Sequence, residues 1–553
     1  MAGPPRLARQ QIQPEAAHTF DPDGRTEDAM MIDHDAPLLS GSRADRRRLL
    51  GAGGVLAGAA ALFGAAPTAA TMDYRNAPFA ARRADMPTWR PDPTFYPSPR
   101  SAMQAPAETL AYVVRVNPTG DGRPDAIAVV DVDPASRTYG QLVGEVEMTQ
   151  PGDELHHFGW NACSSMLCPN AAHPHVERRY LIVPALGSSR VYIIDTKPDP
   201  TQPRIIKTIE AAEIAEKAGY ANGHTVHCGP DGIYVSALGA PDGAGPGGIF
   251  MLDHDTFDVL GRWEIDRGDQ YLHYDFWWHL GYDTMVSSEW GTPTMVDTGV
   301  QPDLLLAGEY GHQLHFWDLR DRRLAQTVDL GKEHQIALEL RPAHDPTKAY
   351  GFVNTVVSLN DLSANVFLWR RQDGANGAAG WETVKVITIP AEPADEDQLP
   401  PALKPFKAVP PLVTDIELSV DDRFLYVSCW GTGELKQFDV SDPLHPKETG
   451  SVRIGGIVGR ASHPAAAGPL NGGPQMVEVS RDGRRVYVTN SLYLPWDAQF
   501  YPDGIRGWMV KLDADPAGGM TVDPDFFPDF GDQRPHQVRL QGGDASTDSY
   551  CFP

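Results

Sequence analysis

The sequence is poor in cysteine, poor in basic residues relative to acidic ones, and almost without helical periodicity. Its 47 basic and 73 acidic residues give a formal net charge of -26, and the resulting surface field repels a phosphate backbone. This balance argues against nucleic acid as a partner. The five cysteines are too few and too scattered for a disulfide scaffold, and their odd number leaves at least one unpaired: Cys163, Cys168, Cys228, Cys429 and Cys551.

Long hydrophobic runs are also missing, apart from one weakly apolar segment near the N-terminus. Three arginines at 46–48 precede the Gly- and Ala-rich residues 51–66, and small residues follow at 67–70. Glycine and alanine make a poor membrane span, so the pattern predicts a twin-arginine signal peptide. The long stretch before the arginines indicates either an extended signal or a translation start at Met30 or Met31.

Residues 1–70 are therefore interpreted as an extension and signal peptide, and residues 71–108 as a lead-in segment. We expect export through the twin-arginine route, to the periplasm or otherwise out of the cytoplasm, and no stable membrane span once the signal is removed. The competing interpretation of the apolar segment is a buried helix or a retained anchor.

From about residue 109 onward, short β-branched strands alternate with polar turns. The copies "IELSVDDRFLYVS" from Ile416 and "VEVSRDGRRVYVT" from Val477 are offset by 61 residues. One such hairpin cannot bury its faces alone, and roughly seven units fill residues 109–553. We therefore predict an all-β fold, a β-propeller of seven blades that forms the catalytic domain. A β-helix would show shorter repeats, and two β-sandwiches would not keep this spacing.

Six of the 18 histidines cluster at predicted strand starts. A single histidine is more often a surface or core residue than a ligand, but the inner strands of a propeller converge on one channel. Imidazoles gathered there suit copper, zinc or iron, and we expect at least three of the six to share one metal. The candidate ligands are His156, His157, His224, His227, His344 and His536.

Strand geometry restricts this set. Only one of His156 and His157 faces the channel if their segment is extended, because adjacent strand residues point to opposite sides. His224 and His227 can face one metal only if the backbone turns between them. Cys228 follows His227 directly, so the same alternation turns it away, and we expect it to be buried and structural. Three further histidines remain as extras: His312, His315 and His334.

Aromatic and acidic residues supply a second set of candidates. Residues 274–290, "YDFWWHLGYDTMVSSEW", together with Trp160, Trp430 and Trp496, would form either an apolar substrate pocket or the seals between blades. Glu289 and Asp415 are the carboxylates expected to support a metal site or to accept protons.

Several long motifs, among them "DELHHFGWNACSS", "HTVHC", "LVTDIELSVDDRFLYVSCW" and "GGDASTDS", together resemble the selenium-binding protein family, whose enzymatic members are methanethiol oxidases. The resemblance covers the whole predicted mature chain. It implies a seven-bladed propeller and, for exported bacterial members, a copper-dependent reaction in which methanethiol, dioxygen and water give formaldehyde, hydrogen sulfide and hydrogen peroxide. A small-molecule thiol and dioxygen are thus the expected partners, with a homo-oligomer possible.

Protons must move in such a reaction, and His157 or Asp415 is the candidate catalytic group for moving them. Two positions depart from the vertebrate members: Gly140 and Ala545 stand where those proteins carry cysteines, which disfavours covalent selenium binding. The alternatives are a non-catalytic propeller that binds selenium, thiols or copper, and a hydrolytic propeller. Hydrolytic propellers rely on carboxylates and amides around a hard cation, whereas histidines predominate here.

Overall fold

The computed structural model describes residues 92–118, 120–167, 175–229, 231–373, 379–459 and 461–548. The predicted extension and twin-arginine signal over 1–70 lie outside the described residues, as do most of the lead-in segment, Cys168 and Cys551. Within the described ranges, no helix is long and apolar enough to cross a membrane.

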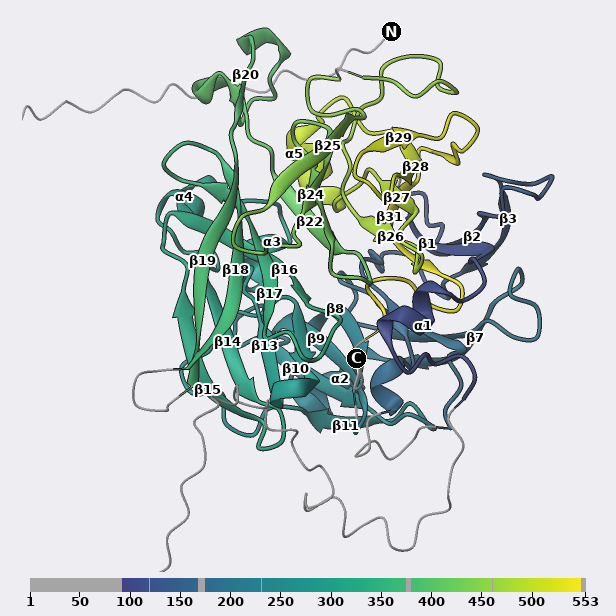
Figure 1. The fold of residues 1–553 in the computed structure, drawn as a ribbon, viewed down its shortest axis with the longest axis vertical. Helices are drawn as coiled ribbons and strands as arrows, with labels where there is room; N and C mark the ends of the chain where they lie inside the picture. Colours follow the sequence, from purple (N-terminus) through teal and green to yellow (C-terminus); the bar gives the residue numbers. More distant parts are fainter. Residues whose placement is uncertain are drawn as a thin grey trace, which may run out of the picture. The chain divides into compact units, whose positions relative to one another are not determined.

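Within these ranges, seven antiparallel sheets of four strands, one of them with a fifth strand, follow one another along the chain. In Figure 1 the first strands of these sheets lie toward the middle of the molecule and the last strands toward its rim. Six sheets are each built from consecutive strands. The first three are β4 (Gly159–Trp160), β5 (Tyr180–Pro184), β6 (Val191–Asp195) and β7 (Arg204–Ile209); β8 (Ala221–Cys228), β9 (Ile233–Gly239), β10 (Gly248–Leu252) and β11 (Val259–Arg262); and β12 (Phe276–His279), β13 (Thr284–Ser287), β14 (Gln313–Asp318) and β15 (Arg323–Asp329). The next three are β16 (His334–Pro342), β17 (Tyr350–Ser358), β18 (Ala364–Asp373) and β19 (Ala379–Ile389); β22 (Val413–Leu418), β23 (Phe424–Cys429), β24 (Glu434–Asp439) and β25 (Lys447–Arg453); and β26 (Val477–Val479), β27 (Arg485–Thr489), β28 (Gly507–Ala514) and β29 (Met520–Val522), with β30 (Asp529–Gly531) paired to β28.

The seventh sheet closes the ring. The last strand, β31 (Arg534–Leu540), pairs antiparallel with β1 (Leu110–Val116), which continues into β2 (Ala126–Asp131) and β3 (Leu142–Glu147). The C-terminal strand thereby becomes the inner strand of a blade whose other strands come from the start of the domain. This closure protects the inner edge that an open ring would leave unpaired. The prediction of an all-β, seven-bladed propeller is confirmed.

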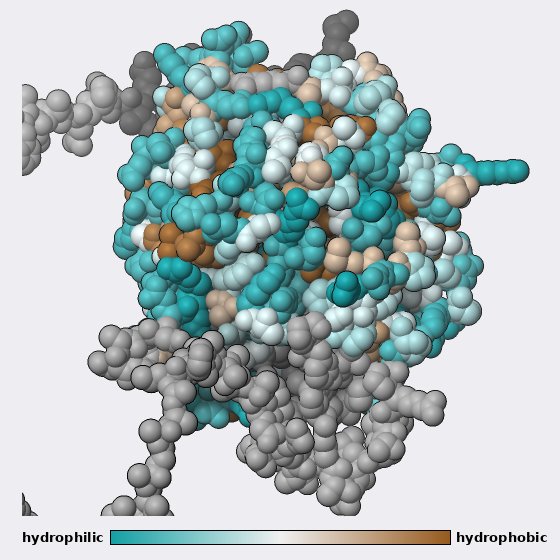
Figure 2. All heavy atoms as spheres, in the orientation of Figure 1, coloured by the Kyte–Doolittle hydropathy of each residue, from teal (hydrophilic) through white to brown (hydrophobic). Residues whose placement is uncertain are grey.

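Burial falls from the inner to the outer strands of a blade. All nine residues of β16 are buried, whereas β19, the outer strand of the same blade, is mostly half-buried or exposed. The surface drawn in Figure 2 is accordingly mainly hydrophilic, with small separate apolar areas. A polar side chain on an inner strand is removed from water and must find a partner within the protein.

Short helices and a small two-stranded sheet occupy the connections between blades. They are α1 (Pro99–Met103), α2 (Ala211–Ala218), α3 (Pro293–Val296), α4 (Pro302–Leu306), α5 (Leu494–Phe500), and the pair β20 (Glu392–Pro393) and β21 (Ala408–Val409). Residues of α3, α5 and the segment around β21 share one apolar cluster with Trp290 and Trp430. This cluster lies against the histidines described next.

Candidate metal centre

Four of the six predicted histidines come together among the inner strands. His156 and His157 lie shortly before β4, His224 lies in β8, and His536 lies in β31. The ring centroids of His156 and His536 are 3.8 Å apart, and those of His157 and His224 are 4.0 Å apart. One ligand nitrogen from each of His156, His157 and His536 lies within 4.8 Å of the other two, and all three side chains are buried. We call these four residues the histidine centre.

Both His156 and His157 belong to this centre because their segment is not an extended strand. Regular pairing in β4 begins only at Gly159, and Glu154 has a left-handed backbone with φ of 48°. Strict alternation of side chains therefore does not apply, and the two imidazole rings stack with centroids 4.8 Å apart.

The backbone of β8 separates the other pair. The pairing of β8 with β9 shifts register between Gly223 and Val226, so a bulge lies at His224. His227 packs instead on Trp277, with ring centroids 4.1 Å apart, and its Nε2 lies 4.0 Å from a carboxylate oxygen of Asp275. The sequence allowed His224 and His227 to face one metal only if the backbone turned between them. The contacts of His227 show that its side chain does not join that of His224.

The structure does not bring His344 to the histidine centre. Its Nδ1 lies 3.1 Å from Asp422 Oδ1, and its Nε2 lies 2.6 Å from the carbonyl oxygen of Ala545. The physical reason is its position along the chain. His344 follows the inner strand β16, whereas His156 and His157 precede theirs, so it lies at the other end of its blade.

Burial keeps the imidazoles of the histidine centre neutral. It lowers the pKa of His156, His157 and His224 well below the usual value, with a further contribution from neighbouring imidazoles, and it lowers the pKa of His536 to about 3. Neutral imidazole is the form that binds a metal.

The free nitrogens of these rings fit a metal cation. In the part of the chain that the structure describes, Nε2 of His157, His224 and His536 has no hydrogen-bond partner although each is buried, and the same holds for Nε2 of His227 outside the centre. Nδ1 of His536 donates to the carbonyl of Ser491 at 2.7 Å, which leaves a lone pair on Nε2. Buried polar atoms are otherwise almost always paired, so several converging lone pairs match what a metal ligand set requires.

A network of buried charges adjoins the centre. Arg341 contacts four carboxylates, the nearest oxygens lying 2.9 Å away in Glu417, 3.2 Å in Asp415, 3.3 Å in Glu339 and 3.6 Å in Asp275. Burial raises the pKa of Asp415 and of Glu417, and the guanidinium counteracts part of this rise. Of this set, the sequence predicts only Asp415 as a site residue. The signal for Glu339, Arg341 and Glu417 is present as charged residues inside the apolar runs "IALELRP" and "TDIEL", and Asp275 is the single charge in the aromatic run "YDFWW".

Glu339 connects this network to the histidine centre. Its Oε1 accepts a hydrogen bond from the Tyr274 hydroxyl at 2.8 Å and lies 3.9 Å from His157 Nε2. Glu289, the other carboxylate proposed from sequence, is instead 2.8 Å from His315 Nε2 and accepts from two backbone N–H groups.

Aromatic side chains line the histidine centre on another side. The Tyr274 ring centroid lies 4.3 Å from that of His224, and Tyr493 and Trp290 lie 6.1 Å from His156 and 6.5 Å from His224, respectively. Trp496 and Trp430 extend the same cluster. Trp160 lies elsewhere, edge-on to Tyr112. The aromatic residues near the centre thus form an apolar wall.

The fold and these contacts define a class of protein: a closed seven-bladed β-propeller with a buried centre of neutral histidines on its inner strands. A profile of the family "56kDa selenium binding protein (SBP56)" matches residues 89–551. The chain belongs to this selenium-binding protein family.

Individual relatives agree with this assignment. A methanethiol oxidase from Xenopus laevis is 39% identical over 480 residues, covering 82% of this chain and 97% of that protein. Selenium-binding protein 1 from Arabidopsis thaliana is 38% identical over 479 residues, covering 82% and 94%. The crystal structure of a hypothetical selenium-binding protein from Sulfolobus tokodaii has 60% sequence identity and a TM-score of 0.81, covering 84% of this chain and 100% of that one.

Proposed function

We propose that this chain is a copper-dependent methanethiol oxidase that converts methanethiol, dioxygen and water into formaldehyde, hydrogen sulfide and hydrogen peroxide. The observation that carries the proposal is the convergence of buried neutral histidines whose Nε2 atoms lack partners among the described residues. Relatives named methanethiol oxidase, 38 to 40% identical over 82% of the chain, support the choice of reaction.

The residues that would hold the copper ion are the histidine centre: His156, His157, His224 and His536. Copper bound there supplies a redox-active Lewis acid for the thiol sulfur. The hydrogen bond from His536 Nδ1 to Ser491 fixes the ring tautomer and the direction of Nε2. His344 is left out of this ligand set because both of its ring nitrogens contact other groups. His227 is left out because its ring packs among Phe276, Trp277 and Trp278 and not against the imidazoles of the centre.

The aromatic wall and the carboxylates serve the substrate. Tyr274, Trp290 and Tyr493 give the methyl group an apolar contact surface and exclude water from it. Glu339 Oε1 is the proton acceptor nearest to the centre, since it touches the Tyr274 hydroxyl and faces His157. Asp415 acts through Arg341, and its second oxygen accepts from the backbone N–H of Val477 at 2.7 Å.

Export through the twin-arginine route is the proposed localisation. The arginines at 46–48 support it, and so does a disulfide between Cys163 and Cys228, because disulfides persist mainly in oxidising compartments. Replacing the three arginines at 46–48 with lysine should retain the protein in the cytoplasm, as cell fractionation would measure. Unchanged export would contradict this route.

The function is tested with the purified full chain loaded with copper. Oxygen uptake should begin on addition of methanethiol, and formaldehyde, sulfide and peroxide should accumulate in equal amounts. Copper-loaded protein that consumes no oxygen with methanethiol would overturn the oxidase and favour a propeller that only binds thiols or copper. Tightly bound calcium in place of copper would favour hydrolytic chemistry.

A further inference from the structure

The one disulfide among the described residues joins two neighbouring blades. Cys163 follows β4 and Cys228 is the last residue of β8, and the Cα atoms of the two lie 6.0 Å apart across 65 residues of sequence. Both residues are buried. The bond therefore links the ends of two inner strands that belong to different sheets. The burial of Cys228 that the sequence predicts is confirmed, whereas its pairing with Cys163 is not predicted by the sequence.

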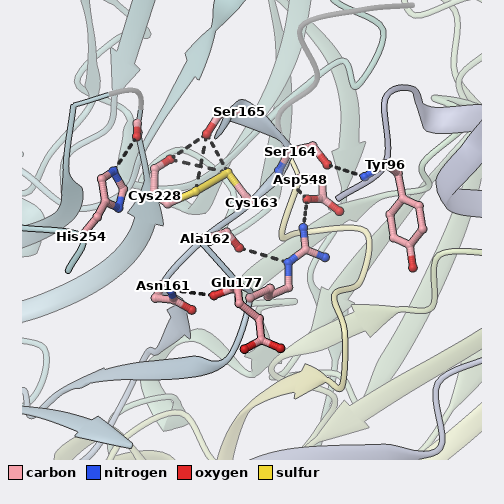
Figure 3. Close-up of a disulfide and its surroundings, with 12 residues drawn as sticks. Tyr96, Asn161, Ala162, Cys163, Ser164, Ser165, Glu177, Cys228, His254 and Asp548 are labelled. Carbon is pink, nitrogen blue, oxygen red and sulfur yellow. Dashed lines mark hydrogen bonds and ion pairs between the residues drawn. A yellow bond between two sulfur atoms is a disulfide. The ribbon is translucent and has the colours of Figure 1, made fainter. Parts of the chain in front are cut away.

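The surroundings hold the Cys163 side of this bond in place. Figure 3 shows the disulfide between the loop of Cys163 and the end of β8, with Ser165 beside it. Ser165 Oγ lies 3.4 Å from the carbonyl oxygen of Cys228, and the backbone N–H of Ser164 donates to Asp548 at 2.8 Å. The short loop after β4 is thus fixed to β8 and to the C-terminal segment.

Three of the four residues of the histidine centre lie on β8 or directly before β4. His157 precedes Cys163 by six residues, and His224 precedes Cys228 by four. Between these points the strands touch closely, since a Cβ on Gly159 would lie only 2.6 Å from the carbonyl oxygen of Val226. A closed path therefore runs from His157 along β4, across the disulfide, and back along β8 to His224.

We propose that the Cys163–Cys228 disulfide is a positioning element of the histidine centre, and that its redox state sets how tightly the centre holds a metal. The inference rests on the metal site of the proposed function. With the bond intact, the spacing of β4 and β8 is fixed before the metal arrives. Without it, the two strands separate more freely, and the ligand set must be ordered at the moment of binding.

The chemical step needs only a dithiol as reductant. One thiolate of the dithiol attacks a cysteine sulfur and breaks the S–S bond, releasing the other cysteine as a thiol. The second thiol of the reductant then displaces the first cysteine and closes a disulfide in the reductant. Two electrons and two protons pass to the protein, which is left with two thiols. A small-molecule disulfide, or the disulfide form of a thiol–disulfide oxidoreductase, would take back the two electrons and two protons by the same exchanges in reverse and would restore the bond.

The test compares metal affinity in the full chain with and without the bond. The probe is Cu²⁺ titrated against a competing chelator, and the variant is C163A/C228A, in which no new thiol can bind the metal. We expect its copper affinity to fall about tenfold or more, in the range found when supporting residues of metal sites are removed. Reduction of the wild type by a dithiol, followed by removal of the reductant, should expose two thiols and increase the rate of amide hydrogen exchange in β4 and β8.

Two controls separate positioning from general stability. Cys429, which is buried and free of a disulfide in the described part of the chain, is replaced by alanine, and this change should leave copper affinity unchanged. Val427→Ala in β23 removes buried methyl groups in another blade, so it should lower thermal stability without changing copper affinity.

Three outcomes overturn the inference. Equal copper affinity in C163A/C228A and wild type would show that the disulfide does not position the ligands, while leaving the proposed oxidase intact. An equal loss of affinity in Val427→Ala would assign the effect to stability alone. A wild-type protein that binds no copper would overturn the proposed metal centre and this inference together.

Discussion

Replacing Arg341 by methionine is expected to destabilise the propeller strongly and in a pH-dependent way. Arg341 is 4% exposed, and its guanidinium nitrogens lie within 3.6 Å of carboxylate oxygens from four different residues. Methionine keeps most of the volume but leaves these carboxylates without their shared cation. Breaking a buried ion pair by removing one partner costs about 3 to 5 kcal/mol. At ~2 cal/mol/K of unfolding entropy per residue, this corresponds to a fall in Tm of about 3 to 5 °C.

The sign of the pH dependence follows from the carboxyl groups. Burial raises the pKa of Asp275, Asp415 and Glu417, and loss of the guanidinium raises the pKa values further. A group with a raised pKa in the folded state binds protons that the unfolded chain has released. Each carboxyl group with a raised pKa therefore costs the folded protein no stability below the unfolded pKa of about 4. As pH rises above this value, the cost grows by ~1.4 kcal/mol per pH unit for each such proton.

Scanning calorimetry at pH 5 and pH 8 measures both effects. The deficit of Arg341→Met relative to wild type should be larger at pH 8 than at pH 5. Arg323→Met is the matched control, because its ion pair with Asp266 at 3.0 Å is largely exposed, and its Tm should not change. An Arg341→Met protein as stable as wild type at pH 8 would refute this account of the buried network.

Two further substitutions test the geometry around the centre. His344→Ala should keep full copper content but lose about 2 to 3 kcal/mol of stability at pH 6 and less at pH 9, as denaturant unfolding would measure. Burial opposes protonation of His344, but its hydrogen bond with Asp422 and the charge of that carboxylate raise the pKa of His344. The stabilisation from this pair is therefore present below pH ~6.5 and is lost as pH rises through the folded pKa of His344. Loss of copper in His344→Ala would contradict the placement of His344 outside the histidine centre. Gly159→Ala should push β4 away from Val226, which should cost about 1 to 3 kcal/mol of stability and weaken copper binding. Gly468→Ala is the control: the space around its Cβ position is open, so stability and copper binding should both stay unchanged. Equal stability of the two variants would show that the close approach of Gly159 to Val226 is not required.

The repeat pattern was enough to predict the fold but not the way the ring closes. Hairpins at similar spacing, such as those from Ile416 and Val477, carry their own turn and strand signals. Pairing of β31 with β1 joins residues more than 400 positions apart, and no local pattern marks it. The Cys163–Cys228 bond was missed for the same reason, since nothing in the sequence indicates that the ends of β4 and β8 meet.

The candidate site was predicted in its residue type and only partly in its membership. The position of histidines at inner strands predicts that they lie close together, and four of them do: His156, His157, His224 and His536. Sequence alone did not tell which end of an inner strand each histidine occupies, so His344 was grouped with them. The exact strand boundaries and the bulge at His224 decide these directions, and both depend on tertiary pairing.

The most direct test of the metal centre is the copper content of purified variants of the full chain. His157→Ala, His224→Ala and His536→Ala should each lose copper while remaining folded, as far-ultraviolet circular dichroism would verify, and His344→Ala should keep it. Full copper content in the first three variants, or loss of copper only in His344→Ala, would contradict the assignment of the histidine centre as the metal site.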